Sequence, residues 1–117
     1  MTISNYFENV LLDRLDTYSV YVKLHIGDPG EDCTQNPATE TTRKLVTFAA
    51  ASGGSKASNN SPQWVSLPAA ETFTHVSLWT AATSGSPLYY GPLGTSIHVK
   101  AGWSLTFNSG SLVVTLD

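Results

Sequence analysis

A chain of 117 residues has room for one domain, and its 41% of hydrophobic residues suffice for an apolar core. Charged residues make up only 13% and the net charge is −3, so the scattered basic residues exclude a nucleic-acid or anionic membrane partner. The single cysteine, Cys33, excludes an internal disulfide. There is no secretion signal and no apolar run near the roughly 18 residues of a membrane span, so we expect a soluble protein.

The first segment, residues 2–16, is predicted to be the only helix. Thr2 or Ser4 is expected to cap its N-terminus. Its apolar residues recur at steps of three and four, which gives one stripe: Ile3, Tyr6, Phe7, Val10, Leu11 and Leu15. So short a helix is not stable alone, so the stripe must pack on something. We favour the chain's own sheet over a neighbouring subunit, for which the predicted contact residues are Tyr6, Phe7, Val10 and Leu11.

From Thr17 onward the hydrophobic period changes from that of a helix to the two-residue period of a strand. Residues 18–26 alternate as a half-buried strand that ends at the turn sequence Gly27-Asp28-Pro29-Gly30. Residues 31–42 are expected to form a surface loop, and residues 51–62, rich in Ser, Gly and Asn, a flexible excursion. The other predicted strands lie at residues 44–49, 63–67, 72–80, 88–91, 96–100, 104–108 and 111–116.

Many short strands without long intervening helices are typical of an all-β fold. We predict an antiparallel β-sandwich or barrel-like domain with a short N-terminal α-helix. Its parts are a helix or arm at residues 1–17 and a single β-sandwich domain at residues 18–117.

No catalytic or metal-binding motif stands out. The histidines at positions 25, 75 and 98 fall in separate predicted strands, and no motif links a serine to any of them. The acidic residues of the loop 28–32 lack the alternating spacing of a calcium loop. We therefore expect no catalytic residue, no metal and no cofactor.

The tryptophans admit two interpretations. Together with Tyr89 and Tyr90, they either fill the core or a subunit contact, which we favour, or form an exposed platform that stacks on sugar rings. The three tryptophans are Trp64, Trp79 and Trp103.

Several stretches together are similar to a known family. They are HIGDPG at residues 25–30, RKLVTF at 43–48, AASGGSK at 50–56, THVSLW at 74–79 and GSLVVTL at 110–116. Over residues 18–117 the chain resembles small virion proteins of actinobacteriophages, which are described as tail-fibre-like or minor tail proteins. Similar β-rich proteins decorate phage heads.

The resemblance implies a non-catalytic structural protein of the phage virion. Our leading hypothesis is a head decoration protein that binds the lattice of the major capsid protein, as a homotrimer by analogy with such proteins. The alternative is a minor tail or tail-fibre protein that contacts other tail proteins and binds host carbohydrate. An enzyme is the third and weakest hypothesis.

Overall fold

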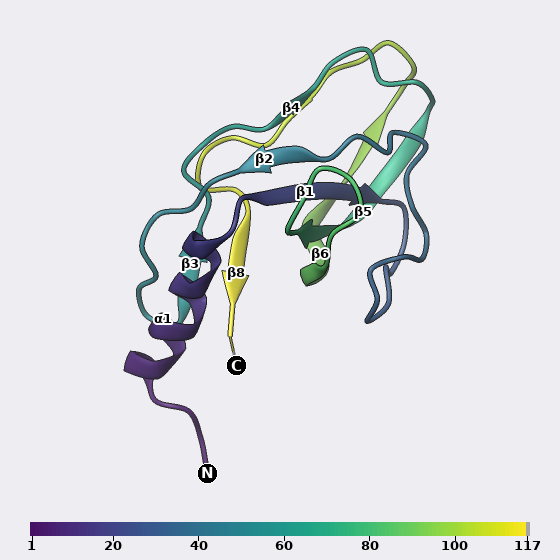
Figure 1. The fold of residues 1–117 in the computed structure, drawn as a ribbon. Helices are drawn as coiled ribbons and strands as arrows, with labels where there is room; N and C mark the ends of the chain where they lie inside the picture. The colour runs from purple at the N-terminus through teal and green to yellow at the C-terminus, as the bar shows by residue number, and fades with distance from the viewer. Residues whose placement is uncertain (117) are drawn as a thin grey trace.

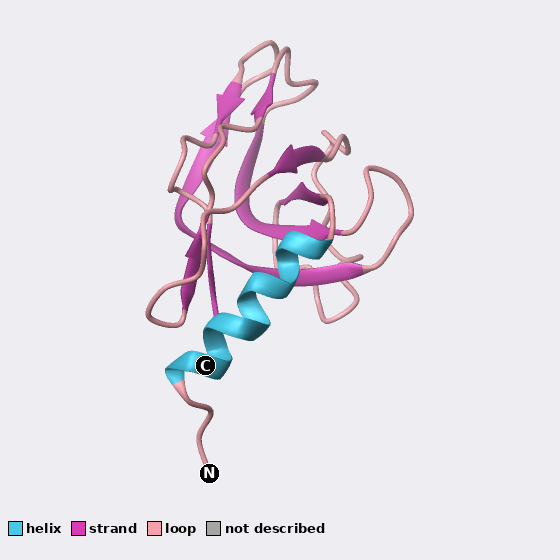
Figure 2. Cartoon of the chain, turned by 60° about the vertical axis from the view of Figure 1, so that its left-hand side comes forward, coloured by secondary structure: helices cyan, strands magenta, loops and turns pink. Residues whose placement is uncertain are grey.

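The computed structural model describes residues 1–116, and Asp117, the last residue of the predicted domain, lies outside them. A single short helix precedes a body built from strands (Figures 1 and 2). The elements in chain order are α1 (Asn5–Asp13), the 3₁₀ helix η1 (Arg14–Thr17), β1 (Val20–His25), β2 (Lys44–Val46), β3 (Ser55–Ala57), β4 (Gln63–Trp64), β5 (Glu71–Trp79), β6 (Pro87–Val99), β7 (Leu105–Thr106) and β8 (Val113–Thr115).

All strand pairs are antiparallel. The largest sheet has the order β2-β1-β5-β6, and two short ribbons pair β3 with β8 and β4 with β7. In the centre of the large sheet, Val22 lies opposite Leu78 and Leu24 opposite Val76. The predicted all-β antiparallel fold with a short N-terminal helix is therefore confirmed.

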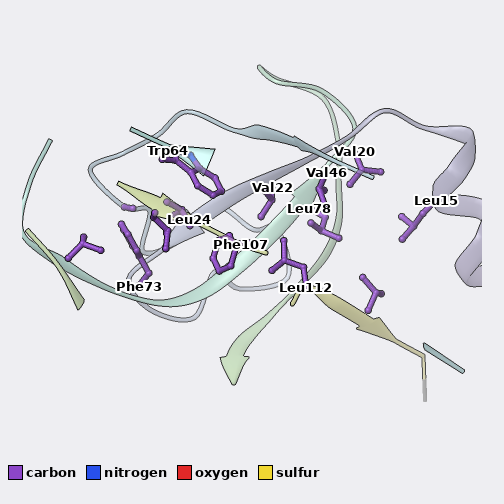
Figure 3. Close-up of a cluster of buried hydrophobic side chains, with 14 of the residues drawn as sticks. Leu15, Val20, Val22, Leu24, Val46, Trp64, Phe73, Leu78, Phe107 and Leu112 are labelled. Carbon is purple, nitrogen blue, oxygen red and sulfur yellow. The ribbon is translucent and has the colours of Figure 1, made fainter. Parts of the chain in front are cut away.

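The core lies on one face of the large sheet, and side chains from both ribbons close over it (Figure 3). The two-residue period of β1 places Val20, Val22 and Leu24 on this face, where all three are buried. From the ribbons, the rings of Trp64 and Phe107 meet edge to face, with centroids 5.7 Å apart. Such pairs stabilise a core beyond the area that they bury.

The helix is shorter than predicted but begins where one of the two expected caps lies. The Ser4 side chain accepts a hydrogen bond of 3.2 Å from the backbone N–H of Phe7. This bond satisfies a donor that the first helical turn leaves unpaired. The α-helix ends at Asp13, and η1 continues it for one turn to Thr17.

The structure differs from the prediction in two places, and the first is β6. The strands expected at residues 88–91 and 96–100 are one long strand, β6, which runs through Pro92. A bulge joins the halves, because Phe73 pairs with Ile97 while His75 pairs with Pro92. Proline is tolerated here because β6 is an edge strand, where a missing N–H breaks no ladder.

The second error concerns residues 51–62, which were expected to be flexible. They contain β3, which pairs with β8 and packs against α1. Gly54 explains part of this contact: its φ is +79°, and a Cβ there would lie 2.8 Å from a carboxylate oxygen of Glu8. Glycine thus permits both the turn and the close approach of the helix.

Candidate assembly surface

Four large apolar side chains lie exposed together on one side of α1. Tyr6 is 78% exposed, Phe7 50%, Val10 45% and Leu11 40%. Their spacing of three and four residues places them on one helical face, which we call the free helical face. Figure 2 shows the N-terminal part of the helix projecting beyond the strands. The free helical face is thus an apolar ridge made of the four predicted contact residues, and the rest of residues 1–116 covers it only in part.

Polar contacts attach the opposite side of α1 to the loop before β3. The Asn9 side chain accepts a hydrogen bond of 3.0 Å from the backbone N–H of Gly54. One turn later, the Asp13 carboxylate accepts a bond of 2.8 Å from the N–H of Ala51. These contacts fix which side of the helix faces the strands.

An ion-pair cluster at Lys56, on β3, completes this attachment. The Lys56 side chain is fully buried, and its Nζ donates to Asp13 Oδ1 at 2.6 Å and to Asp16 Oδ2 at 3.0 Å. Burial alone would lower the pKa of the Lys56 ammonium, but its hydrogen bonds to the two carboxylates outweigh that effect and raise the pKa. The bond from Lys56, together with that from the N–H of Ala51, lowers the pKa of the Asp13 carboxyl.

The expectation that the apolar stripe of the helix packs on the chain's own sheet was wrong for most of its members. Within the stripe, Leu15 is buried, whereas the free helical face points away from the strands. The residue that enters the core from α1 is Leu12, which lies outside the stripe. The physical reason is that Asn9 and Asp13 bind β3 and its preceding loop, and these polar anchors turn the stripe outward.

An open apolar groove of about 270 Å³ lies between β8 and the edge of the large sheet formed by β5 and β6. We call this the apolar groove, and no charged side chain lines it. Its lining residues include Phe48, Val76, Leu78, Tyr90, Val113 and Val114.

The three tryptophans do not share one exposed face. Trp64 and Trp79 are buried, and the Arg43 guanidinium lies 3.9 Å from the centre of the Trp79 ring. Trp103 is half-exposed, with the Lys100 ammonium 5.9 Å from its ring centre. Of the three indoles, only that of Trp103 is therefore exposed enough to belong to a sugar platform.

A buried hydrogen-bonded chain links residues that no motif connects in the sequence. His25 Nδ1 lies 2.9 Å from the carbonyl oxygen of Gln35, so this nitrogen carries the proton. Ser77 Oγ then donates to His25 Nε2 over 2.7 Å and accepts from the indole N–H of Trp79 over 2.8 Å. Burial lowers the pKa of His25, which keeps the imidazole neutral. Because both His25 and Ser77 are fully buried, this serine–histidine pair meets no substrate and is a structural contact.

The geometry offers no metal centre among the described residues: within residues 1–116, no three His, Cys, Asp or Glu side chains gather closely enough to hold an ion. In the same part of the chain, no helix has the length and apolar character needed to cross a lipid bilayer.

The comparison with protein families agrees with an assembly role. A family model described as "Podophage GP4 fiber I protein gp80" matches residues 2–115, which include the helix and every strand. No curated protein matches the chain. The match confirms the resemblance to phage virion proteins at this broad level, through a podophage fibre family rather than an actinobacteriophage one. The chain therefore belongs to the family of the podophage GP4 fibre I protein gp80 and is a structural protein of the phage virion.

Proposed function

We propose that this protein is a subunit of a phage tail fibre and contacts a neighbouring virion protein through the free helical face. The family description supports the fibre, and it places this hypothesis ahead of the head decoration protein that the sequence favoured. The observation that carries the proposal is the apolar ridge of Tyr6, Phe7, Val10 and Leu11. Exposed apolar patches on a folded protein mark surfaces that other proteins cover.

The ridge is ready to bind without further folding. Asn9, Asp13 and Lys56 hold α1 in place, so a partner does not have to order the helix on contact. Covering each partly exposed side chain contributes about 1 kcal/mol or more. Since association itself costs at least about 4 kcal/mol, one such face supports only a weak contact. Many subunits that repeat the contact in one fibre strengthen it through their high effective concentration.

Host carbohydrate binding is not part of this proposal, because two of the three indoles that would form the platform are buried. The predicted homotrimer stays a prediction. We expect tail components rather than the capsid lattice to be the partners, again because the matching family is described as a fibre.

Cryo-electron microscopy of the intact phage tests the proposal. We expect density with this fold in a fibre, with the outer side of α1 pressed against a neighbouring subunit. Copies that sit between capsomers of the head would overturn the proposal and restore the decoration hypothesis.

A further inference from the structure

Two basic side chains lie side by side on the outer face of the large sheet, which is the face opposite the core. Val22 is buried in the core, so its neighbour in β1, Lys23, lies on the outer face. In the antiparallel register Val22 lies opposite Lys44. The next pair along the two chains is therefore Lys23 beside Arg43, the residue just before β2. We call Lys23 and Arg43 the cation pair.

Neither member of the cation pair has an acidic partner in the described part of the chain. Both ion pairs within residues 1–116 belong to Lys56. The Cys33 thiol near Lys23 is uncharged at neutral pH, because burial and then repulsion from Asp32 raise its pKa. Partial burial, and then repulsion from the guanidinium, lower the pKa of Lys23. Two partly buried cations that no residue neutralises indicate a site for an anion from outside the chain.

The Arg43 guanidinium is held in a fixed position. It lies 3.9 Å from the centre of the Trp79 ring. Its Nη1 donates to the carbonyl oxygens of Ala81 at 3.0 Å and Ser84 at 2.7 Å, both in the turn between β5 and β6. These bonds use Nη1 alone, so the Nε–Nη2 edge has no acceptor within residues 1–116. Two parallel N–H groups on such an edge bind both oxygens of a carboxylate.

We propose that the cation pair binds the carboxylate of an aspartate or glutamate side chain from a neighbouring virion protein. Arg43 donates to both carboxylate oxygens, and the Lys23 ammonium supplies the second positive charge. Both side chains are only partly buried, so a carboxylate from outside can reach them. The nature of the partner rests on the assembly function proposed above, whereas the affinity for a carboxylate rests on the cation pair itself.

The surroundings of the cation pair favour a protein carboxylate over that of an acidic sugar. A sugar ring binds best against an exposed aromatic face, but Trp79 is buried beneath the Arg43 guanidinium. The neighbouring side chain on the outer face is Leu45, which is 46% exposed and suits an apolar residue beside the acidic one. A single ion pair of this kind is weak, and repetition of the contact along a fibre would strengthen it.

Titration of the ¹⁵N-labelled protein with short peptides, followed by NMR, tests the inference. The probe is acetyl-Gly-Glu-Gly-amide, and the control is the same peptide with glutamine in place of glutamate. We expect the glutamate peptide to shift the Arg43 Nε–H resonance in a saturable way, because this N–H would donate to the carboxylate. The glutamine peptide has the same shape without the charge and should leave the resonance in place.

Substitutions that remove one charge each measure the share of the cation pair. Lys23→Gln should weaken binding of the glutamate peptide about tenfold or more, because the carboxylate loses its second cation. Lys100→Gln is the matched control: it removes the same charge from an exposed position that follows β6. Arg43→Lys keeps the charge but lacks the two-donor edge, so it should also weaken binding. If Arg43→Lys does not fold, Lys23→Gln and the Nε–H resonance decide the test.

Three results would overturn the inference: no shift of the Arg43 resonance, equal shifts with the glutamate and glutamine peptides, or unchanged binding by Lys23→Gln. Tighter binding of sodium glucuronate than of the glutamate peptide would assign the site to an acidic sugar and overturn the protein partner. None of these results bears on where the protein lies in the virion. Copies found on the head would overturn the fibre function and leave the measured carboxylate binding intact.

Discussion

Replacing Ser77 with alanine removes the hydroxyl at the centre of the buried hydrogen-bonded chain. The methyl group that remains fits the same space, so the change isolates the hydrogen bonds. His25 Nε2 and the indole N–H of Trp79 would both lose their partner, at distances of 2.7 and 2.8 Å in the intact protein. A buried polar group left unpaired costs about 1–3 kcal/mol, so two such groups lower the free energy of unfolding by roughly 2–6 kcal/mol. That is a large part of a typical stability of about 5–15 kcal/mol.

Urea denaturation followed by circular dichroism measures this difference. Ser96→Ala is the matched control, because Ser96 is exposed on β6, and it should change the free energy of unfolding by less than about 0.5 kcal/mol. In a Trp79→Phe background the indole N–H is already absent, so Ser77→Ala should then cost less than in the wild type. If Ser77→Ala proves no more destabilising than Ser96→Ala, the chain contributes nothing to stability and our reasoning is refuted.

Two further predictions concern titratable groups. Because burial lowers the pKa of His25, the unfolded chain binds a proton below about pH 6.5 that the folded chain does not. The free energy of unfolding should therefore fall as the pH drops through 6.5 and level off below the folded pKa; a flat urea-denaturation profile from pH 7.5 to 5 contradicts this. Lys56→Met keeps the buried aliphatic stem but removes the ammonium that holds α1. Amide hydrogen exchange in α1 should therefore accelerate, whereas exchange in β1 and β5 should not change. The pKa of Asp13 should also rise, because its carboxylate loses the hydrogen bond from Lys56. Unchanged exchange in α1 would show that the ion pairs do not hold the helix.

Local patterns in the sequence were enough to predict several elements. Three of these predictions depend on interactions within a few residues of the chain. They are the cap at Ser4, the alternation of Val20, Val22 and Leu24, and the span of β5. The four helix residues named as possible partner contacts are exposed on one face, and their contact with a partner stays a prediction. The helical period showed that these residues share one face of the helix, but it did not show whether that face packs on the strands or is exposed.

What escaped prediction depends on residues far apart in the chain. Lys56 lies in a segment whose composition predicts a flexible loop. Its ion pairs with Asp13 and Asp16, together with the hydrogen bonds that Asn9 and Asp13 accept from the loop before β3, explain why the helix turns its stripe outward. In the same way, His25 and Ser77 meet because β1 pairs with β5 in one particular register. The sequence shows one lysine in a polar stretch and two aspartates in the predicted helix, but it does not show that the lysine is buried or which charges meet.

The attachment of α1 at Lys56 also decides how the protein would carry a pulling force in the proposed fibre. The backbone itself leads from α1 through η1 into β1, an inner strand of the large sheet. The ion pairs of Lys56 tie the same helix sideways to β3, in a ribbon in which three residues of β3 pair with β8. Tension on the N-terminus would therefore first detach the helix from β3 and only then load β1 and the large sheet. The protein would extend in steps, with an N-terminal joint that yields before the body does.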